Sequence, residues 1–411
     1  MINLKTYPNG LKVITEEIPY VNTFSVGMCF KTGSRKETKK LNGISHFVEH
    51  MIFKGTEKRN TKKITDEIES IGGYLNAFTT KEYTCFYAKG LNGTLNKTFE
   101  VLSDIIQHAI FDPKEIKKES GVIRDEILDY EDSPEDFIFD RFETEIYQGN
   151  SLAYPVLGTI ENVSRFTQND LKSFVKNNYG INNLIISVVG NVKEKTVYNL
   201  VPKFIVDLSN VKNNNGKTVK NIFPHNSFIQ KNIQQSHIII GEPVVGYNHK
   251  DRNIVRLLSI ILGEGSSSRL FQTLREKNGI AYQIQSFLNS YRETSAFGIY
   301  VSTNNKVFPK AVDLIYKELN KLKQKKVSEK ELRRAKEYLK GSIVIDLEST
   351  SNRMIRWAQS TIYFNRIKSV QEVLNEIDNI MREQILEQAN ITFNEEEFFS
   401  VLLSPNNSLG L

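Results

Sequence analysis

Apolar and polar residues alternate in several short segments of both halves of the chain, which predicts β-strands. In the first half these segments are residues 11–17, 23–31, 74–79, 84–88 and 184–189, and in the second half residues 236–241, 283–289 and 296–303. Helical patterns lie between predicted hairpins rather than between every pair of strands. This order favours an α+β fold, with an antiparallel-rich mixed sheet covered by helices in each half, over a doubly wound parallel sheet.

The composition of residues 208–221 predicts a break between two domains. This segment contains three consecutive asparagines, Gly216 and several lysines but few apolar residues, which is typical of a linker. The length of the chain suits two domains of about 200 residues each. We therefore expect an N-terminal domain at residues 1–207 and a C-terminal domain at residues 222–411.

Residues 42–54 form a helical pattern that carries the sequence H-x-x-E-H. Asn42 or Ser45 can act as its N-cap. Positions i, i+3 and i+4 lie on one face of a helix, so His46, Glu49 and His50 project the same way.

Two imidazoles one turn apart can both bind zinc, and a carboxylate between them can accept a proton from the water that the metal activates. Glu49 is therefore the candidate general base, and His46 and His50 are the candidate ligands. The alternative is a pair of packed core histidines. A chance pair that frames a glutamate is improbable in a chain with six histidines.

A second helical pattern, residues 112–136, can supply the third ligand that a catalytic zinc needs. It begins at Asp112, a good N-cap, followed by proline. Glu119 and Glu126 are seven residues apart and share a face with apolar residues, so this face is expected to point inward. We predict that Glu126 is a ligand and that Glu119 orients a ligand or a water. A solvated acidic face is the alternative.

The second half repeats the pattern of the first but not its candidate ligands. Residues 112–118 (DPKEIKK) and 328–334 (SEKELRR) both have a capping residue, an acid three positions later, an apolar residue and two bases. Residues 54–56 likewise align with residues 264–266. In this alignment His46 corresponds to Arg256, Glu49 to Ser259 and His50 to Ile260. Glu119 corresponds to Ala335 and Glu126 to Ser342. The C-terminal domain is therefore expected to be a diverged repeat without metal ligands that contributes substrate contacts.

These motifs resemble the pitrilysin (M16) family of inverted-motif zinc peptidases. The likeness is to its short branch, which includes the β subunit of the mitochondrial processing peptidase and its bacterial relatives, and it covers nearly the whole chain. The family pairs H-x-x-E-H with a glutamate that follows the second histidine by the spacing found here between His50 and Glu126, and often has a second acid matching Glu119. The resemblance implies one Zn²⁺ per chain and two similar domains arranged as a clamshell.

Two further stretches match the family and imply substrate contacts. Residues 71–79 resemble an edge strand beside the zinc, where Asn76 and Ala77 would pair with the backbone of a peptide, a binding mode known as β-augmentation. Residues 268–282 resemble the family's C-terminal signature. There the resemblance implies that Arg275 and Tyr282 hold the substrate carbonyl and stabilise the developing oxyanion.

The composition limits the partners and the compartment. The net charge of +6 arises from interspersed residues and does not indicate nucleic-acid binding, whereas seven acids between residues 125 and 136 would favour basic peptides. Cys29 and Cys85 lie in strand-like segments, where reduced core thiols are expected. The chain has no secretory h-region and no apolar span of membrane length, so a cytoplasmic protein without a membrane contact is expected.

Together these patterns predict a zinc-dependent endopeptidase that hydrolyses extended peptides in a cavity between two homologous domains. One alternative is a non-catalytic structural or partner subunit of a processing-peptidase-like assembly, although such relatives typically have a broken metal motif. Another is a zinc site that only stabilises the fold, although such sites usually have four protein ligands, often cysteines. A homodimer or a complex with a partner subunit is left open.

Overall fold

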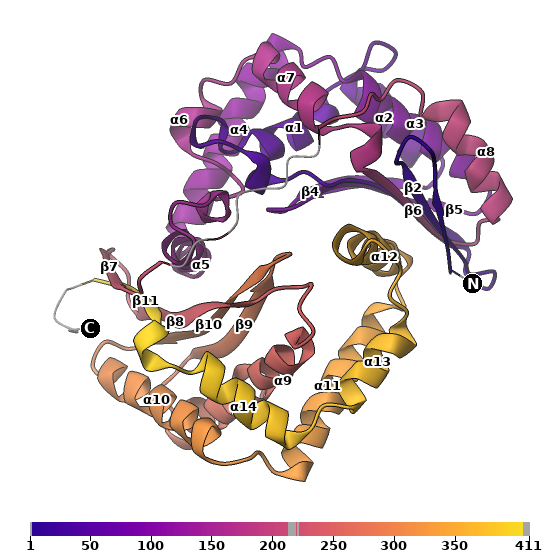
Figure 1. Ribbon diagram of the computed structural model, residues 1–411. Helices are drawn as coiled ribbons and strands as arrows, with labels where there is room; N and C mark the ends of the chain where they lie inside the picture. Colours follow the sequence, from indigo (N-terminus) through magenta and orange to yellow (C-terminus); the bar gives the residue numbers. More distant parts are fainter. Residues whose placement is uncertain (1, 213–218, 220–221, 406–411) are drawn as a thin grey trace. The chain divides into compact units, whose positions relative to one another are not determined.

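The computed structural model describes residues 2–212, 219 and 222–405 and contains two β-sheets with helices (Figure 1). The strands are β1 (Ile2–Thr6), β2 (Lys12–Glu17), β3 (Thr23–Phe30), β4 (Tyr74–Thr79), β5 (Thr84–Leu91), β6 (Leu184–Gly190), β7 (Asn226–Gln230), β8 (Ser236–Val245), β9 (Gln283–Ser290), β10 (Thr294–Thr303) and β11 (Phe399–Ser404). The α-helices are α1 (Ile44–Ile52), α2 (Thr61–Glu69), α3 (Leu95–His108), α4 (Pro113–Asp132), α5 (Pro134–Ile146), α6 (Ile160–Val163), α7 (Gln168–Asn178), α8 (Glu194–Phe204), α9 (Arg252–Gly263), α10 (Phe308–Gln324), α11 (Glu329–Asp346), α12 (Thr350–Phe364), α13 (Val370–Asp378) and α14 (Arg382–Thr392). The predicted α+β class is confirmed, and each predicted strand is present.

The first compact unit is built on a sheet with the strand order β1-β2-β6-β3-β5-β4. It comprises Met1–Asp129, Tyr154–Lys217 and Asp346–Lys368. Only the β2–β6 pair is parallel; the other neighbours are antiparallel. This sheet is therefore the antiparallel-rich mixed sheet that the strand pattern predicts.

The two faces of this sheet are covered by different helices, as the alternation along β3 requires. The even-numbered residues of β3, such as Phe24 and Val26, point into the core that the sheet forms with α1, α3, α7 and α8 (Figure 1). On the opposite face, Ser25 bonds to hydroxyl groups at the start of α12, with both O···O distances 2.9 Å. A Cβ at Gly27 would meet Met354 of α12 at 2.2 Å, so this helix packs closely on β3.

The second unit has a sheet with the order β7-β11-β8-β10-β9, in which only β7 and β11 are parallel. It comprises Tyr130–Ala153, Thr218–Ile345 and Ser369–Leu411. One face packs on α9, α10 and α14 through residues such as Ile238 and Ile240. The other face packs on Ile138 and Phe142 of α5 through Ile239 and its neighbours.

The two sheets share one connectivity. The strands β2, β3, β4, β5 and β6 have the same order, pairing and direction as β7, β8, β9, β10 and β11. In both units the strand that corresponds to β3 is followed by a helix, α1 or α9, that covers the same side of the sheet. α4 and α11 occupy equivalent places in the chain.

The compact units are not contiguous in sequence, which differs from the predicted division into residues 1–207 and 222–411. α5 packs on the second sheet, and α12 packs on the first sheet. α12 is held there because Arg353 and Trp357 both donate hydrogen bonds to Glu16 of β2, at 2.6 and 2.7 Å. Most of the predicted linker, residues 208–221, lies outside the described residues.

The expectation of two reduced thiols is wrong in this structure. Cys29 and Cys85 form a disulfide, because β3 and β5 place them directly opposite each other with their Cα atoms 4.0 Å apart. Within the described part of the chain, no helix is both long and apolar enough to cross a bilayer.

Candidate metal centre

The start of α1 is held by the carboxylate of Glu37 from the preceding loop, and the predicted N-cap at Asn42 or Ser45 is wrong. The N-cap residue is Gly43, whose φ of 97° is a conformation that favours glycine. The buried Glu37 carboxylate accepts hydrogen bonds from the N–H groups of Gly43 and Ser45, both at 2.8 Å, and from the Asn42 amide at 3.0 Å. Burial raises the pKa of Glu37 to about 7, and these hydrogen bonds act against that rise.

Three predicted ligands from two helices come together. The Nε2 atoms of His46 and His50, on α1, lie 3.9 and 3.8 Å from Oε2 of Glu126, on α4. One ligand atom from each of the three residues lies within 4.8 Å of the other two. Among the described residues, this is the group of histidines and carboxylates that is arranged to hold a metal ion.

The donor set and its spacing fit zinc. Ligand atoms bound to one tetrahedral zinc lie about 3.3 Å apart, so small side-chain movements suffice to close the site. Burial, and then the neighbouring His50, lower the pKa of His46 to about 3, which keeps its imidazole neutral and able to bind a metal. Nδ1 of His46 is buried without a hydrogen-bond partner, whereas the Glu126 side chain is 43% exposed. Three protein ligands with one exposed side are typical of a catalytic rather than a structural site.

Glu119 contacts the ring nitrogen of His50 that faces away from Glu126, as predicted for a residue that orients a ligand. It also pairs with Lys54, which the sequence patterns did not single out. Its Oε1 atom is 3.0 Å from Nδ1 of His50, and its Oε2 atom is 2.6 Å from the ammonium of Lys54. Burial alone would raise the pKa of Glu119, but these two partners hold it below its ordinary value. Burial likewise opposes protonation of His50, yet Glu119 and the nearby acids raise the pKa of His50. The signal for Lys54 was its position, four residues after His50.

Glu49 lies beside the ligand group and is held by a threonine. Its Oε2 atom accepts a hydrogen bond of 2.5 Å from Oγ1 of Thr79, at the end of β4. Burial raises the pKa of Glu49, and the hydrogen bond from Thr79 partly opposes that rise. A carboxylate with a raised pKa is suited both to accept and to return a proton. The sequence patterns did not predict this role for Thr79.

Asn76 and Ala77 lie on β4, which is the last strand of its sheet. The N–H of Ala77 bonds to Oδ1 of Asn76 at 2.8 Å, so this donor does not contribute to the ladder with β5. The amide of Asn76 also donates to the Tyr74 hydroxyl at 2.8 Å. An edge strand whose outward backbone groups are not used in the ladder is the kind of surface to which an extended peptide can add.

Arg275 and Tyr282 belong to the second unit and contact each other. Nη1 of Arg275 donates to the backbone carbonyl of Tyr282 at 2.9 Å, and its guanidinium lies 6.0 Å from the Tyr282 ring centroid. The Tyr282 residue is 68% exposed. The pair therefore presents polar groups to solvent, and its role in catalysis stays a prediction.

In the second unit, the residues that correspond to the candidate site residues make other contacts. Arg256 of α9 pairs with Glu264 at 2.7 Å, and Ser259 donates to the same carboxylate at 2.8 Å. Ala335 of α11 is buried in the apolar core. In the part of the chain that the structure describes, the candidate metal group is confined to the first unit.

Comparison of the sequence with known families finds two adjoining matches. Residues 12–160 match Insulinase (Peptidase family M16), and residues 165–339 match Peptidase M16 inactive domain. A protein of Bacillus subtilis that is described as a zinc protease is 34% identical over the full length of both chains. One of Rickettsia felis with the same description is 36% identical over 99% of this chain and 98% of its own.

Solved structures show the same fold over the whole chain. A protease from Helicobacter pylori has a TM-score of 0.89 with 25% identity, and the alignment covers 98% of this chain and 99% of that one. A Pseudomonas fluorescens protein described as a peptidase M16 inactive domain has a TM-score of 0.92 with 17% identity over 98% of each chain, which shows the fold alone. These matches confirm the family resemblance. The chain belongs to peptidase family M16, a family of zinc proteases, and has its short two-domain fold.

Proposed function

We propose that the chain is a zinc-dependent endopeptidase that hydrolyses extended peptides, with one zinc held by His46, His50 and Glu126. The observation that carries this proposal is the convergence of these three side chains, with Glu49 beside them and not among them. A purely structural site would not need a partly buried carboxylate of raised pKa next to the ligands. The alternative of a non-catalytic subunit is less favoured, because such relatives typically have a broken metal motif, whereas the ligand atoms of His46, His50 and Glu126 lie within 4.8 Å of one another here.

Glu49 is the general base of the proposed reaction. Zinc, when bound, supplies Lewis-acid polarisation of the scissile carbonyl and of the attacking water. Glu49 accepts the proton of that water and later transfers it to the leaving nitrogen. Thr79 fixes the carboxylate of Glu49 through its hydrogen bond of 2.5 Å. Glu119 fixes the ring of His50 through Nδ1.

The edge of β4 is the proposed binding site for the peptide backbone. A substrate strand would pair there and replace the Asn76 side chain as the acceptor for the N–H of Ala77. Recognition through backbone hydrogen bonds gives affinity without selecting one sequence. The exposed acids Asp125 and Asp129 on α4 would favour basic peptides. The assignment of Arg275 and Tyr282 to oxyanion stabilisation rests on the family resemblance.

Digestion of a mixed peptide library by the purified chain tests the proposal. We expect internal peptide bonds to be cleaved, cleavage to stop when a chelator is added, and activity to return with stoichiometric zinc. Metal analysis of the same sample would show about one zinc per chain. A chain that holds zinc but cleaves no peptide, alone or in a homodimer, would instead support the role of a non-catalytic partner subunit.

A further inference from the structure

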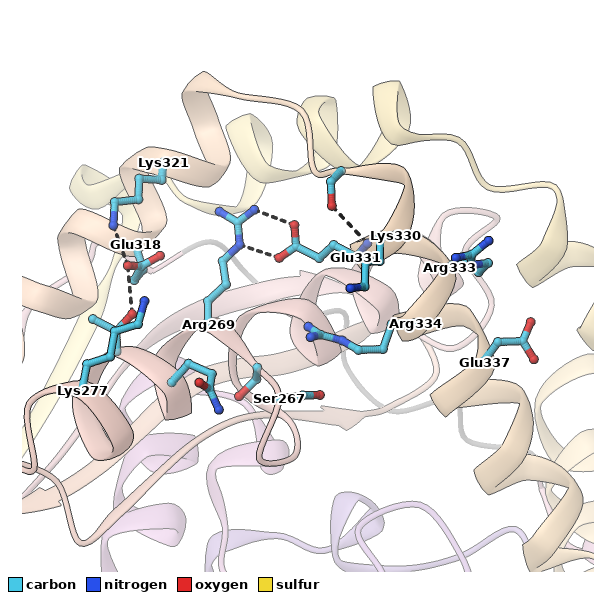
Figure 2. A pocket seen from close by; sticks show the side chains of 14 residues that line it. Ser267, Arg269, Lys277, Glu318, Lys321, Lys330, Glu331, Arg333, Arg334 and Glu337 are labelled. Carbon is cyan, nitrogen blue, oxygen red and sulfur yellow. Dashed lines mark hydrogen bonds and ion pairs between the residues drawn. The ribbon is translucent and has the colours of Figure 1, made fainter.

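The second unit contains a pocket whose lining residues are all polar or charged. Its volume is about 780 Å³, and it lies between the segment that follows α9, the end of η5 (Phe271–Lys277), α10 and the start of α11 (Figure 2). Serine, threonine, glutamine, lysine, arginine and glutamate make up the lining, with no apolar side chain. Pockets for drug-like ligands are mostly apolar, so this one is unsuited to a lipid, a base or an apolar peptide side chain.

The acidic residues of the pocket are all engaged. Glu331 forms a bidentate pair with Arg269, at 2.7 and 2.9 Å, which Figure 2 shows across the upper side of the pocket. Glu318 accepts from Lys321 at 2.7 Å and from a threonine hydroxyl at 3.1 Å. Glu337 pairs with Lys340, which does not line the pocket, at 2.8 Å. Each carboxylate of the lining therefore already has a cationic partner.

Four of the six basic side chains of the lining have no such partner. Lys277, Lys330, Arg333 and Arg334 form no ion pair within 4.0 Å of a described carboxylate, and the lining holds only three acids. Burial acts to raise the pKa of Glu331, but Arg269 and, more weakly, the nearby Arg334 hold it below its ordinary value. In Figure 2 the guanidinium of Arg334 extends from α11 toward the space between Arg269 and Ser267. Like charges gathered in one concavity repel one another, and an anion that binds among them removes this cost.

We propose that this pocket binds a small, multiply charged anion of the oligophosphate class. Arginine guanidinium groups and serine hydroxyls can donate hydrogen bonds to the terminal oxygens of phosphate groups, and charge-assisted hydrogen bonds to them are stronger than neutral ones. No apolar residue lines the pocket, which favours a ligand that is charged over its whole surface, such as an oligophosphate, over an acidic peptide. This site is separate from the proposed zinc site, since its residues lie in the second unit.

Calorimetric titration of the full chain with inorganic triphosphate tests the inference. We expect one saturable site that weakens as salt is raised, and an affinity at least about tenfold lower in the double variant Arg333→Gln/Arg334→Gln. The matched control is Lys323→Gln/Lys325→Gln, which removes the same charge from residues outside the pocket. It should change the affinity by less than about threefold. All substituted side chains are at least partly exposed, so folding should be preserved, which circular dichroism can verify.

Three outcomes would overturn this proposal. Triphosphate could fail to bind the unaltered chain at low salt. Both double variants could lose affinity equally, which would show a diffuse effect of surface charge. An oligoglutamate peptide could bind at the same place more tightly than triphosphate, which would make the site a docking point for acidic peptides.

Discussion

The ammonium of Lys54 lies 2.6 Å from the Glu119 carboxylate, whose other oxygen is 3.0 Å from Nδ1 of His50. Lys54 therefore acts on the candidate metal centre through two intervening groups. Its positive charge helps to keep the buried Glu119 ionised, and the ion pair fixes the direction in which Glu119 meets the imidazole. Outer groups of this kind set the orientation and the basicity of a ligating histidine.

Replacement of Lys54 by methionine is expected to weaken zinc binding by about tenfold or more. Without the ammonium, Glu119 is no longer held, and more negative charge acts on His50, so a proton competes better with the metal for that ring. Competition with a fluorescent chelator near neutral pH measures the effect. The control is Lys58→Met, because Lys58 is exposed and forms no ion pair with a described carboxylate. Equal zinc affinities in both variants would remove Lys54 from the site.

Two amide substitutions separate the base from the ligand. Glu49→Gln should lower kcat by at least about 10²-fold while zinc stays bound, because a proton acceptor is lost and no ligand is lost. Glu126→Gln should weaken zinc binding, because a carboxylate ligand is replaced by a neutral amide. Peptide hydrolysis and metal analysis are measured on both proteins. Loss of zinc from Glu49→Gln would make Glu49 a ligand, and unchanged zinc in Glu126→Gln would mean that another residue completes the site.

The hydroxyl of Thr79 is expected to contribute to the rate rather than to binding. Thr79→Val keeps the shape of the side chain but removes the donor to Glu49, so kcat should fall by roughly tenfold with little change in KM or in zinc content. The hydrogen bond lowers the pKa of Glu49, so its loss should move the acidic limb of the pH–rate profile to higher pH. Thr79→Ser should restore both properties. A valine variant with unaltered kcat would show that Glu49 does not need this contact.

The stability of the second unit is expected to fall as pH rises because of Glu242 on β8. Burial, and then the nearby Glu397, raise the pKa of Glu242 from 4.5 to about 9. Between these values the folded chain retains a proton that the unfolded chain has released, so the free energy of unfolding decreases with increasing pH, by at most about 1.4 kcal/mol per pH unit. Glu242→Gln should remove this decrease, and its stabilising effect should be larger at alkaline than at acidic pH.

Urea titrations followed by circular dichroism at about pH 5, 7 and 8.5 measure the difference for Glu242→Gln. Tryptophan fluorescence is unsuitable, because the one tryptophan, Trp357, lies in the first unit. Glu396→Gln is the control, since Glu396 is an exposed carboxylate next to Glu397. If the stability difference between Glu242→Gln and the unaltered chain were independent of pH, the carboxyl of Glu242 would not be held protonated.

Several strands and the helix faces that carry the candidate ligands were predictable because their signals are local. The period of two along β3 and the period of 3.6 along α1 and α4 depend only on neighbours in the chain. The strands β1, β7 and β11 were not predicted. β1 and β7 are short edge strands, and β11 is a buried apolar run without alternation, which pattern alone does not distinguish from a helix.

The sequence by itself determined the fold class and the helix faces that carry His46, Glu49 and His50 and, on α4, Glu119 and Glu126, while the family resemblance pointed to Glu126 as the third ligand. Only the tertiary structure decided that Lys54 and Thr79 complete the centre, that Cys29 lies opposite Cys85, and that α5 and α12 pack on the sheets of the other halves of the chain. The reason is physical. Side-chain direction within an element follows from backbone geometry, whereas contacts between elements depend on strand register and on which apolar faces remain to be buried.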